Sequence, residues 1–138
     1  MRYLLDTNVL SELRKGVRCH PAVFQWFQAQ HMPDVFTSVL VIGELRNGIE
    51  RLRRSDPAQA WNLERWLETL FTRFAGRMLP VDRIIAEEWG RISAPDPLPT
   101  VDGLLAATAI VHDMTLVTRD AKVSASCGVR VLNPFDWK

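Results

Sequence analysis

The sequence predicts a three-layer α/β/α domain built on a mainly parallel sheet. Short apolar segments alternate with longer amphipathic segments along the whole chain, which is the pattern of strands joined by crossover helices. Two of the short segments are followed by an aspartate, Asp6 after "RYLL" and Asp120 after "TLVT" and Arg119. Because ligands of such sheets lie beyond the carboxyl ends of the strands, these two acids indicate a shared site.

The composition is that of an ordinary globular protein. The 138 residues are 47% hydrophobic and 24% charged, so we expect one domain, residues 1–138, with a core of its own. No apolar run approaches the roughly 20 residues that span a bilayer, and Asp6 and Glu12 interrupt any signal-peptide pattern. We therefore expect a cytoplasmic protein without membrane contact. Cys19 and Cys127 fit a reducing compartment as free, small apolar side chains.

In the first half of the chain we expect strands at "RYLL" (2–5) and "DVFTS" (34–38). Thr7 or Asn8 is expected to cap a short helix that stops at Gly16, and "HPAVFQWFQAQ" follows as a helix opened by proline. Ser38 is placed to cap a third helix, and "RRSDPAQ" separates it from a fourth. These two long helices are amphipathic, with apolar faces at Ile42, Leu45, Ile49 and Leu52, and at Leu63, Leu67, Leu70 and Phe74.

In the second half, "RMLPV" (77–81) is expected to be an edge strand, because proline cannot donate to a central ladder. Asp82 is expected to cap a helix that carries Ile85, Trp89 and Ile92, and "APDPLPT" reads as a loop. The segment "VDGLLAATAIVHD" is apolar nearly all round, so it predicts a buried helix. The last strands are expected at "TLVT" and "VRVL", with a loop at "AKVSASCG" after Asp120.

Two further acids are candidates because of their surroundings. Glu44 is flanked by apolar residues on the third helix, and Gly43 and Gly48 beside it indicate close backbone packing, since a helical glycine costs about 1 kcal/mol relative to alanine. Asp102 opens the apolar segment "GLLAATAI". Each acid also has a purely structural interpretation: a turn or cap for Asp6, an exposed helix charge for Glu44, an N-cap for Asp102 and a turn for Asp120.

Four segments that contain these acids, "LLDTNVLSEL", "VIGELRNGI", "TVDGLLAATA" and "LVTRD", resemble in order and spacing the signatures of PIN-domain nucleases. More narrowly, the chain resembles VapC- or FitB-type toxins of bacterial type II toxin–antitoxin pairs, down to the ending "GVRVLNPFDW". The resemblance implies a Mg²⁺- or Mn²⁺-dependent endoribonuclease. It also implies a homodimer restrained by an antitoxin that binds DNA and represses the shared operon.

The resemblance also implies the roles of the acids. Asp6 and Asp102 would bind the metal directly, whereas Glu44 and Asp120 would act through water or hold a second ion. Relatives often have asparagine in place of Asp120, in a "TRN" motif. Asn8 and Thr118 are placed to hydrogen-bond the carboxylates or a bound phosphate.

The chemistry of the four acids agrees with a metal site. Two carboxylates about 4–5 Å apart repel by roughly 3–4 kcal/mol at an effective dielectric constant of about 20, so a cluster of four needs a cation. Oxygen ligands select Mg²⁺ or Mn²⁺, and the four motifs contain neither His nor Cys, which argues against zinc. A hard cation can polarise a phosphate and supply hydroxide for in-line hydrolysis.

The rest of the chain carries a net charge of +5 once the four acids are removed from the formal total of +1. This suits a protein that binds phosphates. The basic residues gather in two clusters that could equally be solvated faces or partner surfaces: Arg14, Lys15 and Arg18, and Arg46, Arg51, Arg53 and Arg54.

The residues around Asp6 argue against two rival functions and leave a third open. A haloacid-dehalogenase phosphatase needs a second aspartate two residues after the first, where this chain has Asn8. A receiver domain needs an acidic pair after its first strand, where this chain has only Asp6. The remaining rival is a non-catalytic PIN-like module that binds RNA or a partner protein, and it would be marked by loss of site acids.

Overall fold

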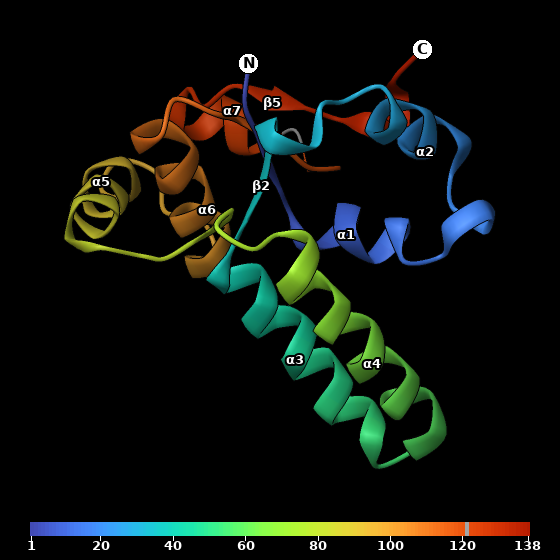
Figure 1. Ribbon diagram of the computed structural model, residues 1–138. Helices are drawn as coiled ribbons and strands as arrows, with labels where there is room; N and C mark the ends of the chain where they lie inside the picture. The colour runs from blue at the N-terminus through green and yellow to red at the C-terminus, as the bar shows by residue number, and fades with distance from the viewer. Residues whose placement is uncertain (121) are drawn as a thin grey trace.

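A five-stranded parallel sheet forms the centre of the computed structural model, which describes residues 1–120 and 122–138 (Figure 1). The strand order is β3-β2-β1-β4-β5, so β1 is central and the proline-bounded β3 lies at an edge. The strands are β1 Tyr3–Leu5, β2 Val35–Ser38, β3 Met78–Leu79, β4 Thr115–Val117 and β5 Val131–Leu132. The expected α/β fold with a parallel sheet is therefore confirmed.

Helices cover both faces of this sheet. Right-handed crossovers in the observed strand order place the helices from α1 to α4 on one face and those from α5 to α7 on the other. Figure 1 shows α5 and α6 on the side opposite α1 and α4. The helices are α1 Thr7–Leu13, α2 Pro21–Gln28, α3 Val39–Arg53, α4 Pro57–Arg73, α5 Arg83–Ser93, α6 Thr100–Val111 and α7 Lys122–Cys127. Short 3-10 turns lie at Gly16–Arg18, Met32–Asp34 and Pro134–Asp136.

The core lies between the sheet and these two helix layers. Leu4 and Leu5 of β1 and Val117 of β4 have no exposed surface, and Leu116 is 2% exposed. Helix α6 is buried along most of its length, as its apolar sequence predicted, and its small side chains let it lie close to the sheet. Burial on both faces explains why the central strands are continuous apolar runs rather than alternating patterns.

The helix caps explain where several chain segments begin. Ser38 accepts a hydrogen bond from Leu40 N (3.0 Å) and Asp82 accepts one from Ile85 N (2.9 Å), as expected from the sequence. The prediction that Thr7 or Asn8 caps α1 was wrong, whereas the interpretation of Asp6 as a cap is confirmed. Asp6 is the cap, because its backbone is still extended and its carboxylate accepts from Thr7 N at 2.6 Å.

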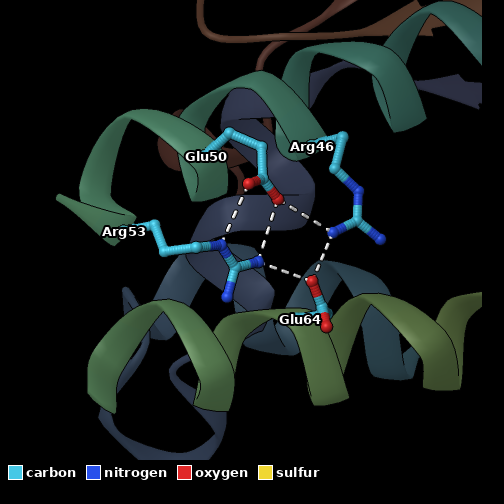
Figure 2. A network of polar contacts seen from close by, with 4 residues as sticks. All are labelled: Arg46, Glu50, Arg53 and Glu64. Carbon is cyan, nitrogen blue, oxygen red and sulfur yellow. Dashed lines mark hydrogen bonds and ion pairs between the residues drawn. The ribbon is translucent and has the colours of Figure 1, made fainter. Parts of the chain in front are cut away.

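Helices α3 and α4 form a pair that extends away from the sheet (Figure 1). Figure 2 shows a charged network across this pair, in which the guanidinium groups of Arg46 and Arg53 both contact Glu64 of α4, at 2.5 and 2.6 Å. Glu50 accepts from Arg53 at 2.9 Å, which holds the pKa of Glu50 down at about 2. Two of the four arginines in the predicted basic cluster are therefore already paired with carboxylates.

Two further expectations were wrong. A Cβ atom at Gly43 or Gly48 would meet nothing within 4 Å, so these glycines do not provide close backbone packing; they lie beside open space on α3. The stretch after Asp120 was expected to be a loop, but residues 122–127 of it form helix α7, and Ala121 lies outside the described residues.

Both cysteines are free, with Cys19 buried. Within the described ranges, no helix is both long and apolar enough to cross a membrane.

Candidate functional site

The candidate site begins where β1 and β4 end side by side. Leu5 pairs with Val117 in the sheet, and the next residue, Asp6, donates its N–H to the Val117 carbonyl at 3.0 Å. This backbone bond places Asp6 directly beside Thr118, although 112 residues separate them in sequence. The parallel register of the two central strands therefore brings the first and last of the sequence motifs together.

Asp6 is held at this edge by polar side chains. Thr118, which is only 1% exposed, donates its hydroxyl to Asp6 Oδ2 at 2.7 Å. Asn8 Nδ2 lies 3.3 Å from the same oxygen and 3.2 Å from Thr118 Oγ1, while Asn8 Oδ1 accepts from Arg119 N. With Thr7 N on the other oxygen, both Asp6 oxygens are oriented before any ligand arrives. Asn8 and Thr118 thus hydrogen-bond a carboxylate, as expected from the sequence, and their contact with a bound phosphate stays a prediction.

Glu44 reaches this edge from α3. Its carboxylate lies on an exposed part of the helix and accepts a hydrogen bond from Thr7 Oγ1 at 2.5 Å. Thr7 was not singled out from the sequence as a site residue. The available signal was its position in "DTN", directly between Asp6 and Asn8. Thr7 connects the second acid to the helix that the first acid caps.

Asp102 lies in the first turn of α6 and is half-buried. It is not the N-cap, since Pro99 occupies that position and makes no side-chain cap bond. The pKa of Asp102 is raised above its usual value by burial, and further by the negative charges of Asp6, Asp120 and Glu44. The negative charges of the other three acids therefore lie close enough to Asp102 to disfavour its ionisation.

The backbone at Asp102 is positioned by α5. A Cβ atom on the next residue, Gly103, would lie 3.0 Å from both Cδ1 and Nε1 of the Trp89 indole. Glycine leaves room for this close approach of the two helices, whereas a Cβ atom would require the indole to shift. Within the described part of the chain, Trp89 Nε1 and Ser93 Oγ are the buried side-chain polar atoms that lack a hydrogen-bond partner.

Asp120 and Glu44 are exposed, whereas Asp6 and Asp102 are partly buried. Its backbone N–H donates to Thr118 Oγ1 at 3.1 Å, and its Oδ1 accepts from Lys122 N at 3.0 Å. Thr118 therefore links two of the acids, because it contacts Asp6 through its proton and Asp120 through its oxygen.

The four carboxylates do not form a complete metal cage among the described residues. In residues 1–120 and 122–138, no three His, Cys, Asp or Glu side chains are arranged so that together they could hold a metal ion. The acceptor groups at this edge are carboxylate oxygens of Asp and Glu and the hydroxyl oxygens of Thr7 and Thr118, and oxygen ligands suit a hard cation.

Comparison with known proteins gives the family. The PIN domain profile matches residues 3–127. Toxin FitB of Neisseria gonorrhoeae is 33% identical over 96% of this chain and 97% of its own length. A VapC ribonuclease of Sinorhizobium fredii is 29% identical over 96% of this chain and 97% of its own length.

The fold comparison agrees. The structure of FitAB bound to an IR36 DNA fragment contains a chain that is 31% identical and superposes with a TM-score of 0.86, covering 99% of this chain and 97% of that one. A VapBC complex from Salmonella typhimurium contains a chain of the same fold with a TM-score of 0.79 at 19% identity. Fold, motif order and full-length similarity together show that this chain belongs to the PIN-domain family, among the relatives of the FitB and VapC toxins.

Proposed function

We propose that this chain is a Mg²⁺- or Mn²⁺-dependent endoribonuclease and the toxin of a toxin–antitoxin pair. The observation that carries the proposal is the state of Asp102, a half-buried carboxylate whose pKa is raised by burial and by three other acids. A protein retains such an unfavourable cluster where a cation completes it. The relatives supply the reaction class, because several of them are named as VapC ribonucleases.

The donor set fits a hard divalent ion. Mg²⁺ is usually bound by one or two carboxylates and keeps several waters, so direct ligation by Asp6 and Asp102 alone is sufficient. Glu44 and Asp120, the more exposed acids, would contact the ion through water.

Protein groups have separate tasks in this proposal. Thr118 and Asn8 orient Asp6 through its Oδ2 atom, and Thr7 orients Glu44. When bound, the cation would polarise the scissile phosphate and lower the pKa of an attacking water. Glu44 or Asp120 would accept a hydrogen bond from that water and hold it in line with the phosphorus–oxygen bond to be broken.

A ribonuclease that attacks the cell's own RNA in the cytoplasm needs a restraint. The related toxin was solved as FitAB on a DNA fragment, so we propose a cognate antitoxin that binds DNA and represses the shared operon. We also propose a homodimer, since two large apolar side chains outside the core, Trp61 and Ile84, are 55% and 53% exposed.

The alternative is a PIN-like module that binds RNA without cutting it, and the lack of a complete metal cage is the observation that favours it. Purified protein should therefore be incubated with total RNA and Mn²⁺, with and without chelator. We expect cleavage that chelator abolishes and that Asp102→Asn lowers by about 100-fold or more. Glu68→Gln, which removes an exposed carboxylate from α4, is the matched control and should cleave normally.

Growth of bacteria that express the chain alone tests the toxin role. Wild type should arrest growth and Asp102→Asn should not. A harmless wild type that also leaves RNA intact with Mn²⁺ would refute the proposal. RNA binding without cleavage would establish the alternative.

A further inference from the structure

Glu44 lines two grooves on the surface of α3. Gly48 lies in the wall of one and Gly43 in the wall of the other, and neither glycine has a side chain to fill the space. One groove has a volume of about 340 Å³ and lies toward α1 and α4, with Gly48 and Trp66 in its wall. The other, which we call the α3 groove, has a volume of about 410 Å³ and is lined by Val39, Leu40, Gly43, Glu44, Asn47, Arg51 and Val101. Val101 lies in the first turn of α6 and directly precedes Asp102, so the α3 groove reaches from Glu44 to the helix turn that carries Asp102.

The polar residues of the α3 groove form one stripe. Glu44, Asn47 and Arg51 follow one another at steps of three and four residues, which places them on the same side of a helix. At 1.5 Å per residue, Arg51 lies about 10 Å along the helix axis from Glu44. A site acid, an amide and a cation therefore follow one another in a line that leads away from the reaction centre.

Arg51 differs from Arg46 and Arg53 in having no carboxylate partner among the described residues. Arg46 and Arg53 point into the network with Glu50 and Glu64, as Figure 2 shows, and their charges are compensated there. In the part of the chain that the structure describes, no ion pair or hydrogen bond of the Arg51 side chain is present, and Arg51 is exposed. Its positive charge is available to a ligand in the groove.

We propose that the α3 groove holds the nucleotide next to the scissile phosphate, with Arg51 on the RNA backbone and Asn47 on the base. This inference rests on the proposed function. An acidic site repels the RNA backbone it must approach, so a cation within reach of a neighbouring phosphate offsets that repulsion. The Asn47 amide both donates and accepts, and single-stranded RNA offers unpaired base edges to such a group. A volume of about 410 Å³ lies within the range of ligand pockets, about 300–1,000 Å³.

Binding of a fluorescein-labelled single-stranded RNA of mixed sequence tests the role of Arg51. Anisotropy is measured in the Asp102→Asn background, where the RNA survives, over a series of salt concentrations. We expect Arg51→Gln to weaken binding about tenfold and to reduce the slope of log K against log salt by about 0.7, the contribution of one phosphate contact on a single strand. Arg54→Gln removes the same charge from the end of the same helix, outside the groove, and should change affinity less than about twofold.

Cleavage in the otherwise wild-type chain tests Asn47. Sequencing of the cut ends of a mixed RNA pool should show that Asn47→Ala relaxes the base preference beside the cut by about tenfold, while Asn62→Ala on the exposed face of α4 leaves it unchanged. Equal effects of Arg51→Gln and Arg54→Gln would overturn the inference.

Dissociation of a dimer in the Arg51→Gln variant, measured by light scattering, would also overturn the inference, because the groove would then be an interface between two copies of the chain. The two proposals fail differently. RNA cleavage that is unchanged in Arg51→Gln would refute only the role of the α3 groove. RNA binding that depends on Arg51 but leads to no cleavage would refute only the proposed ribonuclease activity.

Discussion

Gly103→Ala tests how α5 positions the backbone at Asp102. The added Cβ would lie 3.0 Å from two atoms of the Trp89 ring, which is closer than ordinary van der Waals contact. Overpacking of this kind costs about 1–3 kcal/mol, because a rigid indole must shift together with the helix that carries it. Alanine has a higher helix propensity than glycine by up to about 1 kcal/mol, so the net loss of unfolding free energy is about 0–2 kcal/mol.

Gly90→Ala is the matched control. Gly90 lies in the interior of α5, is exposed, and a Cβ there would meet nothing within 4 Å. It should gain the helix propensity without the clash, so the two variants should differ by about 1–3 kcal/mol. For a domain of this size the difference corresponds to roughly 3–12 °C in melting temperature, measured by circular dichroism or calorimetry.

The second readout is the site itself. A shift of the first turn of α6 moves Asp102, so Gly103→Ala should also lower Mn²⁺ affinity and cleavage, whereas Gly90→Ala should affect neither. Trp89→Leu removes the edge of the indole that the new Cβ would meet. In a chain that already carries Trp89→Leu, Gly103→Ala should therefore lower the free energy of unfolding by less than it does in the wild type. Equal melting temperatures for Gly103→Ala and Gly90→Ala would refute the reasoning, because they would show that the indole yields without cost.

Three further predictions concern charged groups. Asp6→Asn keeps an oxygen at the N-cap of α1 and should abolish cleavage with little loss of stability, whereas Asp6→Ala should cost about 1 kcal/mol more; equal melting temperatures would contradict the capping role. Asp102→Asn should raise the melting temperature of metal-free protein at pH 7. Because the folded-state pKa of Asp102 is raised by burial and by Asp6, its ionisation destabilises the fold above a pH of about 3.8, so the gain should vanish below that pH. A gain that persists in acid would have another cause. Glu50→Gln should lower the melting temperature above pH 4.5, and the difference should disappear as the pH falls toward about 2, because the pKa of Glu50 is lowered by Arg53 and its stabilisation is lost on protonation. Salt should weaken this effect, and a difference that is independent of pH would contradict it.

The sequence alone was sufficient for the fold class and for the position of Asp6. Continuous apolar strands separated by amphipathic helices require a parallel sheet, and an aspartate after such a strand must lie at its carboxyl edge. Ser38 and Asp82 were predicted as caps because capping depends on a local bond between neighbours in sequence. Even so, local reasoning assigned the cap of α1 to the wrong residue, since Asp6 both caps the helix and faces the site.

The tertiary structure alone decided which side chains meet. The register of β1 and β4 places Thr118 on Asp6, and the crossing of α5 and α6 explains Gly103, neither of which is readable from local periodicity. It also separated the arginines of α3, pairing Arg46 and Arg53 with carboxylates and leaving Arg51 unpaired among the described residues, in the groove that Glu44 also lines. Periodicity records which face of a segment is apolar, whereas the partner of a charge depends on how distant segments pack.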